Sequence, residues 1–524
     1  MAEQPVNIPR SSGVLMHLTS LPGPHGCGDL GPSAYRFADF LVAAGQRWWQ
    51  MLPVSPTGLG NSPYLSPSSL AGNPLCVSLV RLQTDGLLTR DEIRPGRGLN
   101  LPGRVPFDAV IAYRLDRLRR AFQRFSVGLA RNREYHAFCR ANAGWLDDHA
   151  LFFALKHAHG GRAWTEWDRE LAFRKPAALA AVRRRLAPDI EFHRFVQFQF
   201  WRQWLALRRY CHQRGIGLIG DIPIYVAHDS ADVWGHREIF DLDRKGQPVA
   251  VGGVPPDHFS KTGQRWGNPL YRWDVLKRRG YDWWIRRLRN MHDLFDLIRI
   301  DHFIGFHRYY RIPAAHRTAE HGRWVPGPDD DLFHAVSKAL GGLPIIAEDL
   351  GKVTPGVFAL RDRFGLPGMK ILQYAFGSAR ADNPFLPHHY PRRCVVYTGT
   401  HDNDTTAGWY QSLRAQAARR DGHKARSTIA YLKKYLDADA REVHWDMIRA
   451  AWSSVADLAI APTQDLLGLD SSCRMNHPGI ADGNWVWRLR DGALSRRVCD
   501  RLRDLTETFG RANVDGAKNR DDQR

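Results

Sequence analysis

The sequence predicts an α/β protein built as a (β/α)8 TIM barrel interrupted by inserted subdomains. Three observations lead to this prediction. Eight short apolar runs are separated by segments in which apolar residues recur at helical spacing. Several of these runs end on charged side chains, as strands do at the catalytic mouth of a barrel. The chain has 524 residues, 44% of them hydrophobic, which is enough for a large core.

The eight predicted strands are spread along most of the chain. They lie at residues 14–21, 48–54, 217–224, 295–303, 344–350, 368–376, 394–400 and 457–462. Their apolar side chains suit parallel strands that are buried on both faces. An open doubly wound sheet is the alternative, but no GxGxxG or GxxxxGK[ST] motif follows an early strand. A closed barrel is therefore the preferred architecture.

Two long interruptions divide this barrel. We expect residues 1–56 to form its first part, 57–214 a mainly helical insertion subdomain, 215–510 its remainder with a lid-like insertion at about 235–275, and 511–524 a flexible tail. Gly, Pro and polar residues dominate the stretch 250–273, so we expect little regular structure there. The tail is polar throughout and has too few apolar side chains to pack.

The formal net charge of +20 raises the question of a nucleic-acid partner. A clustered basic face would bind phosphates in a salt-dependent manner. The Arg residues are instead dispersed through amphipathic stretches such as 114–125, where the apolar residues have helical spacing. We therefore expect no nucleic-acid partner, and tight, steeply salt-dependent binding of an oligonucleotide would contradict this expectation.

The cysteines and the N-terminus bear on the compartment. Seven cysteines are scattered and never form a CxxC pair, which argues against a disulfide framework and against a zinc site. The first residues lack the pattern of a secretory signal, and no run approaches the ~20 apolar residues of a membrane span. We expect a cytoplasmic enzyme with no membrane partner, present as a monomer or homodimer.

Three acidic residues follow predicted strands. They are Asp301 in RIDHF, Glu348 in IIAED and Asp402 in TGTHD. A barrel gathers strand ends into one pocket, and two carboxylates ~5 to 5.5 Å apart carry out retaining glycoside chemistry. A single Asp at such a position is more often a helix N-cap, which is the interpretation we favour for Asp349 and Asp362.

The neighbours of these carboxylates fit the same chemistry. Arg299 lies two residues before Asp301, so both side chains point to one face of the strand and the guanidinium can orient the carboxylate. Apolar residues before Glu348 favour its protonated form. His302 and His401 are suited to donating hydrogen bonds to sugar hydroxyls. No metal or other cofactor is expected, because the HDND stretch offers too few oxygen ligands for a calcium loop.

Long motifs along nearly the whole chain support a resemblance. They include SSGVLMHLTSLPG, WWQMLPVSPTGLGNSPYLSPSSLAGNP, GDIPIYVAHDSADVW, GVPPDHFSKTGQRWGNPLYRW, RIDHFIGF, IIAEDLG, YTGTHDNDTTAGW and RMNHPG. The chain resembles the amylomaltases, the 4-α-glucanotransferases of glycoside hydrolase family 77 in the α-amylase clan. The resemblance implies a barrel without a C-terminal β-sandwich, and about sixty residues after the last predicted strand agree with that.

The resemblance also implies roles for particular residues. Asp301 would be the nucleophile, Glu348 the general acid/base and Asp402 the residue that stabilises the transition state. The implied glucan contacts are Tyr64, Asp257, Arg299, His302 and His401, and with less support Ser62, Gln264, Trp266, Tyr374 and Asn476. No cofactor is implied.

The implied activity is the transfer of 1,4-α-glucan segments between maltooligosaccharides, within glycogen or maltodextrin metabolism. Transfer requires an acceptor sugar to outcompete water, and the lid-like insertion could bring Asp257, Gln264 and Trp266 over the cleft for that purpose. The alternative is an α-amylase-type retaining hydrolase of α-glucans. Eighteen Trp and sixteen Tyr suit sugar binding in either case, because aromatic faces pack on sugar rings.

Overall fold

A closed parallel barrel forms the centre of the computed structural model, which describes residues 7–256, 260–480 and 482–512. Its strands are β1 (Ser11–Leu15), β2 (Trp48–Gln50), β3 (Gly217–Pro223), β6 (Leu297–Asp301), β9 (Ile345–Ala347), β10 (Gly368–Ile371), β11 (Cys394–Tyr397) and β12 (Leu458–Pro462). Around the ring the order is β1-β12-β11-β10-β9-β6-β3-β2. The prediction of eight barrel strands is confirmed.

The first strand begins earlier than predicted. β1 starts at Ser11 and ends at Leu15, and residues Leu18–Ser20 form a 3-10 turn, η1, within the stretch predicted as strand. Two serines and a glycine at the start of β1 precede the apolar run from which the strand was predicted. They are nevertheless buried, because Ser12 donates a hydrogen bond of 2.8 Å to Gln46.

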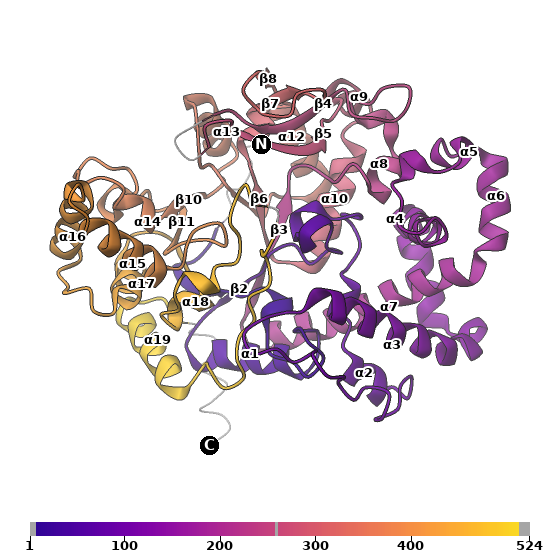
Figure 1. Cartoon of the computed structure of the whole chain (residues 1–524), viewed down its shortest axis with the longest axis horizontal. Helices are drawn as coiled ribbons and strands as arrows, with labels where there is room; N and C mark the ends of the chain where they lie inside the picture. The colour runs from indigo at the N-terminus through magenta and orange to yellow at the C-terminus, as the bar shows by residue number, and fades with distance from the viewer. Residues whose placement is uncertain (1–6, 257–259, 481, 513–524) are drawn as a thin grey trace.

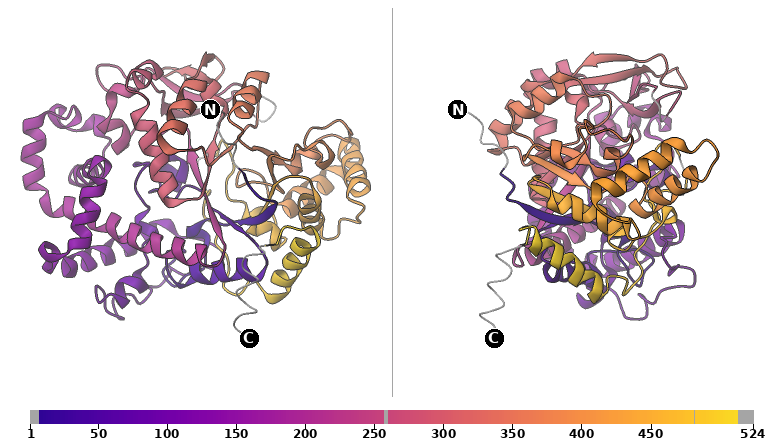
Figure 2. Two further views of the ribbon diagram at one scale, coloured as in Figure 1. Left: turned by 180° about the vertical axis from the view of Figure 1, so that it is seen from behind. Right: turned by 90° about the vertical axis from the view of Figure 1, so that its left-hand side faces the viewer.

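Helices surround the barrel on two sides (Figures 1 and 2). Between β1 and β2 lies α1 (Pro32–Ala43). Between β2 and β3 lie α2 (Leu79–Thr84), α3 (Phe107–Val127), α4 (Arg133–Ala158), α5 (Arg169–Ala172), α6 (Pro176–Arg185) and α7 (Ala187–His212). Those beyond β3 are α8 (Ala231–Gly235), α9 (Trp273–Arg278), α10 (Asp282–Leu294), α11 (Ile304–His307), α12 (Asp330–Leu340), α13 (Pro355–Arg363), α14 (Leu372–Ala375), α15 (Thr406–Ala417), α16 (His423–Leu436), α17 (Val443–Ser453), α18 (Thr463–Leu466) and α19 (Arg496–Thr508). In the described residues after β12 there is no β-sandwich.

The long loop after β2 is anchored on α7. Gln197 on α7 is fully buried and exchanges two hydrogen bonds with the backbone of Gly72, at 2.8 and 2.9 Å. A side chain at Gly72 would collide with the ring of Phe200, since a Cβ there would lie 2.0 Å from it. The helical insertion thus holds the loop that carries Tyr64 against the barrel mouth.

A second sheet lies where little regular structure was expected. β4 (Ala250–Val254), β5 (Gln264–Pro269), β7 (Arg308–Pro313) and β8 (Arg323–Pro326) form an antiparallel sheet in the order β5-β4-β7-β8. The expectation for residues 250–273 is therefore wrong. Gly253 permits the close approach of β5, because a Cβ there would lie 2.1 Å from the carbonyl oxygen of Gln264. Figure 1 shows this sheet at one edge of the molecule, above the barrel.

The C-terminal segment closes the far end of the barrel. Arg511 is fully buried. Its guanidinium donates hydrogen bonds of 2.6 to 3.0 Å to the backbone oxygens of Ser11, Trp452, Ser454 and Ala456. These groups belong to β1 and to the segment that leads into β12, the pair that joins the two ends of the ring. The expectation of a flexible tail is wrong for Arg511, and residues 513–524 lie outside the described residues.

We expect Arg511→Ala to lower the free energy of unfolding by about 3 kcal/mol or more, because several buried carbonyl groups would lose a charged donor. The shift of the urea midpoint measures this loss. Arg496→Ala on α19 is the control, since the Arg496 side chain is 95% exposed. Equal midpoints for the two variants would contradict the assigned role of Arg511.

Among the residues that the structure describes, there is no helix of the length and apolarity needed to cross a membrane.

Candidate active site

β6 delivers two charged side chains to the mouth of the barrel. Its residues Ile298 and Ile300 are buried in the core on one face of the strand. Arg299 and Asp301 share the opposite face, as their spacing predicts, and Arg299 Nη2 lies 3.0 Å from Asp301 Oδ1. The Arg299 side chain is 4% exposed, so its position relative to the carboxylate is set by the surrounding core.

A further carboxylate, Asp221 on β3, completes this arrangement, and sequence reasoning missed it. Asp221 is paired in register with Arg299 on the neighbouring strand and accepts a hydrogen bond of 2.7 Å from Arg299 Nη1. Burial raises the pKa of Asp221, and the Arg299 guanidinium opposes that rise. The available signal was a lone acidic residue within an apolar run, which is costly unless the residue is paired. Arg299 therefore bridges two carboxylates from two strands.

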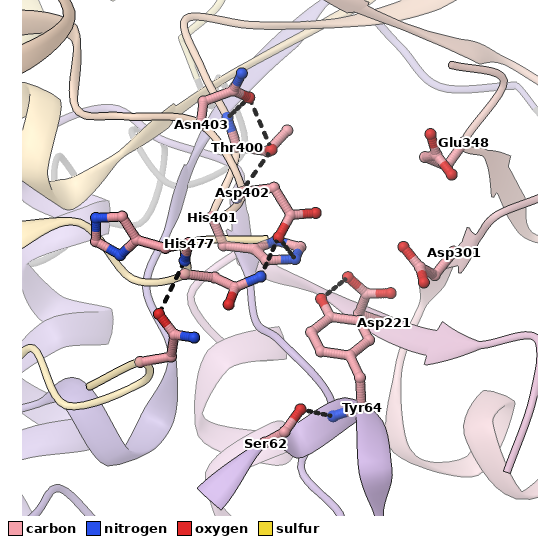
Figure 3. A network of polar contacts seen from close by, with 12 residues as sticks. Ser62, Tyr64, Asp221, Asp301, Glu348, Thr400, His401, Asp402, Asn403 and His477 are labelled. Carbon is pink, nitrogen blue, oxygen red and sulfur yellow. Dashed lines mark hydrogen bonds and ion pairs between the residues drawn. The ribbon is translucent and has the colours of Figure 1, made fainter. Parts of the chain in front are cut away.

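Glu348 directly follows β9 and faces Asp301 (Figure 3). Its backbone N–H donates to Ile300 O at 3.1 Å, and its Oε2 accepts a hydrogen bond of 2.6 Å from the backbone N–H of His302. Burial raises the pKa of Glu348 well above its usual range, the direction that its apolar flanks predict. A group with this pKa can hold a proton at neutral pH.

Asp402 lies on the loop after β11, and its carboxylate points toward Asp301 and Glu348 (Figure 3). Its Oδ1 accepts a hydrogen bond of 2.6 Å from Asn476 Nδ2 and lies 3.4 Å from His401 Nε2. Arg474 Nη2 donates to the backbone oxygen of Asp402 at 2.5 Å. The side chain is 42% exposed, so it remains open toward the cleft.

Aromatic rings line one side of these carboxylates. The Tyr64 ring stacks on His401 with centroids 5.1 Å apart, and Trp485 lies 5.6 Å from Tyr64. Tyr64 Oη donates to Asp221 Oδ2 at 2.9 Å. Ser62 accepts a hydrogen bond from the Tyr64 backbone N–H, and it lies beyond Tyr64 from the carboxylates (Figure 3). Sequence reasoning missed Trp485, because nothing in its local sequence connects it with Tyr64.

The other predicted residues that the structure describes lie on β5, just after β6 and on α14. The Trp266 ring lies perpendicular to His302, with centroids 4.8 Å apart, and its Nε1 donates to Gln264 Oε1 at 3.1 Å. Burial lowers the pKa of His302 to about 4, so its imidazole is neutral at neutral pH. Tyr374 on α14 is 37% exposed and interacts electrostatically with Asp402. Asp257 lies outside the described residues.

Two acidic residues interpreted as helix caps have other structural roles. Asp349 is buried and accepts a hydrogen bond of 2.8 Å from the backbone N–H of Met369. Asp362 lies within α13 and pairs with Arg361. The N-cap interpretation is therefore wrong for both residues, because the strand that follows, or an adjacent Arg, supplies the hydrogen-bond partner. Within the described ranges, no group of three or more His, Cys, Asp or Glu side chains is placed to hold a metal ion.

We expect Arg299→Lys to lower kcat about 100-fold, because a single ammonium group cannot hold two carboxylates as the guanidinium fork does, and a small displacement of a group in the site is costly. Steady-state turnover measures the effect. Arg208→Lys is the matched control, since Arg208 pairs with Asp296 just before the other end of β6, at 2.8 Å. A kcat equal to that of the wild type would contradict the bridging role of Arg299.

The fold and the mouth define a class of protein. A closed parallel barrel with acidic side chains and stacked aromatic rings at the carboxyl ends of its strands is the architecture of a barrel enzyme with a polar substrate. The comparisons with known proteins specify the enzyme further. The family described as 4-alpha-glucanotransferase, Glyco_hydro_77, matches residues 16–495.

Individual relatives match over almost their full length. The 4-alpha-glucanotransferase of Synechocystis sp. is 48% identical, covering 96% of this chain and 98% of the relative. That of Thermus thermophilus is also 48% identical, covering 97% of this chain and 100% of the relative. The structure of amylomaltase from Streptococcus agalactiae in complex with acarbose superposes with a TM-score of 0.91 at 37% identity, covering 96% of this chain and 100% of that one. The chain therefore belongs to the 4-alpha-glucanotransferase family and is a glucan-transferring enzyme.

Proposed function

We propose that the enzyme transfers 1,4-α-glucan segments from a donor maltooligosaccharide to the 4-hydroxyl of an acceptor glucan or glucose, by a retaining double displacement. The observation that carries this proposal is the pair formed by Asp301 and Glu348 on neighbouring strands. Asp301 forms an ion pair of 3.0 Å with the Arg299 guanidinium, whereas burial raises the pKa of Glu348 and favours its protonated form. Retaining glycoside chemistry requires one carboxylate that attacks the anomeric carbon and one carboxylic acid that donates a proton.

The first half of the cycle cleaves the donor. An Asp301 oxygen attacks the anomeric carbon and forms an ester bond while the glycosidic bond breaks. Glu348 gives its proton to the departing oxygen, so the reducing-end fragment leaves with a free 4-hydroxyl. Asp402 holds sugar hydroxyls through its outer oxygen, and Asn476 fixes the orientation of that carboxylate.

The second half restores the α-linkage. Glu348, now ionised, takes the proton of the acceptor 4-hydroxyl, whose oxygen attacks the anomeric carbon as the ester bond to Asp301 breaks. Asp301 returns as carboxylate and Glu348 as acid. No other co-reactant is needed for this cycle, because the proton released in one half is recovered in the other.

We propose that the sheet β5-β4-β7-β8 acts as the lid that favours transfer over hydrolysis. Its strand β5 carries Gln264 and Trp266, and the Trp266 ring contacts His302 beside the nucleophile. An apolar ring at this point shields the ester from water and offers a face to the acceptor sugar.

Incubation with maltotriose tests the proposal. Transfer should yield glucose and a ladder of longer maltooligosaccharides while the total number of reducing ends stays constant, because each cleaved bond is replaced by a new one. A product mixture limited to glucose and maltose, with reducing ends rising in step, would favour the α-amylase-type hydrolase instead. Chromatography of the products combined with a reducing-end assay distinguishes the two outcomes.

A further inference from the structure

His302, which follows the nucleophile directly, has an unusual backbone conformation. Its φ is +55°, in the left-handed region that residues with a Cβ rarely adopt. Such conformations persist where the surrounding structure enforces them, and they concentrate at functional sites. Contacts of the surrounding structure must therefore stabilise the positive φ of His302.

The reason lies in the hydrogen bonds that this turn directs at Glu348. The His302 N–H donates to Glu348 Oε2 at 2.6 Å, and the next N–H, that of Phe303, donates to Glu348 O at 3.1 Å. The backbone of Phe303 lies in the right-handed helical region, with φ −53° and ψ −29°. A left-handed residue beside a right-handed one turns consecutive N–H groups to the same side, in an arrangement that cradles oxygen atoms. The turn thus holds both the side chain and the backbone of Glu348.

The imidazole of His302 makes contacts that are separate from those of its backbone. It contacts the Trp266 ring, and its buried Nε2 has no hydrogen-bond partner among the described residues. The hydrogen bond to Glu348 comes from the backbone alone. Substitutions that remove the ring can therefore be separated from changes that disturb the backbone.

We propose that His302 is a positioning residue for the acid/base, acting through its left-handed backbone. Its N–H occupies Glu348 Oε2, which leaves Oε1 as the oxygen that carries the proton to and from the glycosidic oxygen. This inference rests on the proposed function, in which Glu348 is the acid/base. The nucleophile and the anchor of its partner are then neighbours in sequence, so that one turn sets the geometry of both.

A series of three variants isolates the backbone effect. His302→Gly, His302→Ala and His302→Val all lack the imidazole, so all should bind donor glucan more weakly. Glycine adopts φ of +55° freely, whereas a residue with a Cβ loses about 5- to 30-fold in population there, and valine loses more. We expect kcat to fall in the order Gly, Ala, Val, with the Ala variant about 5- to 30-fold below the Gly variant.

The pH profile provides a second readout. The His302 N–H stabilises the ionised form of Glu348, so losing it should move the basic limb of kcat/KM to higher pH in the Ala and Val variants relative to Gly. Other charged or titratable groups that act on Glu348 include Arg299, Asp301, Asp349 and Tyr374, and none of these four changes within the series.

The same substitutions at Asp437 provide the control. Asp437 is exposed, has φ of +48° and ends α16. Gly, Ala and Val there should lower the thermal midpoint in that order and leave kcat and the pH profile unchanged.

Equal kcat values and equal basic limbs across the three His302 variants would overturn the inference. If the Val variant does not fold, the comparison of the Gly variant with the Ala variant is sufficient to test the positioning role of His302. A different result would contradict the proposed function itself, namely a Glu348→Gln variant that remains active. A flat His302 series beside an inactive Glu348→Gln overturns only the positioning role.

Discussion

Asp301→Asn is expected to abolish glucan transfer almost completely, with a loss of roughly 10⁴- to 10⁶-fold in kcat. The amide keeps the shape of the carboxylate but is a far weaker nucleophile, so the ester to the anomeric carbon cannot form at a useful rate. Maltotriose disproportionation measures the loss. Because the side chain is partly exposed and the change is isosteric, the thermal midpoint should stay close to that of the wild type.

The control for this variant is Asp362→Asn. Asp362 is 63% exposed on α13 and pairs with Arg361. Its replacement should leave transfer unchanged. Near-wild-type transfer by Asp301→Asn would remove Asp301 from the mechanism and, with it, the double displacement.

Glu348→Gln should reduce transfer from maltooligosaccharides about 10²- to 10⁴-fold, the usual contribution of a general acid/base. A donor whose leaving group departs without protonation, such as α-maltosyl fluoride, should restore the first half of the cycle. The same donor should not rescue Asp301→Asn, which lacks the nucleophile. Release of fluoride by each variant separates the two roles, and equal rescue of both would contradict the assignment of acid and nucleophile.

The raised pKa of Glu348 also has a consequence for stability. Burial raises this pKa in the folded state, so the folded protein retains a proton that the unfolded chain releases above its ordinary pKa near 4.3. The contribution of Glu348 to stability is present below that pH and is lost as pH rises through the folded pKa. Glutamine carries no such dependence. The urea midpoint of Glu348→Gln relative to the wild type should therefore increase between pH 5 and pH 8, and a constant difference would contradict the raised pKa.

Much of the barrel could be predicted from local sequence patterns. Apolar runs marked all eight barrel strands, because a parallel strand buried on both faces is mostly apolar. The spacing of Arg299 and Asp301 placed them on one face, since side chains alternate along a strand. Ends of elements were less accurate where polar residues are buried, as in β1, because their partners lie elsewhere in the chain.

The antiparallel sheet β5-β4-β7-β8 was not predicted, for a related reason. β4 pairs with β7, whose residues 308–313 come after β6 in the chain. The glycines of β4 indicate a loop when they are considered alone, but in the structure they allow β5 to approach closely. Close approach between backbones is a property of two segments, and one segment does not report it.

By itself the sequence determined the approximate positions of the barrel strands, the family resemblance and the side chains at the ends of β6, β9 and β11, because apolar runs and local motifs depend on neighbouring residues. The tertiary structure decided which partners those side chains have. Asp221 joins Arg299 across 78 residues, Arg511 closes the ring from the end of the described chain, and the left-handed turn at His302 directs its N–H at Glu348. Each depends on strand register and burial, which arise only when distant segments pack together.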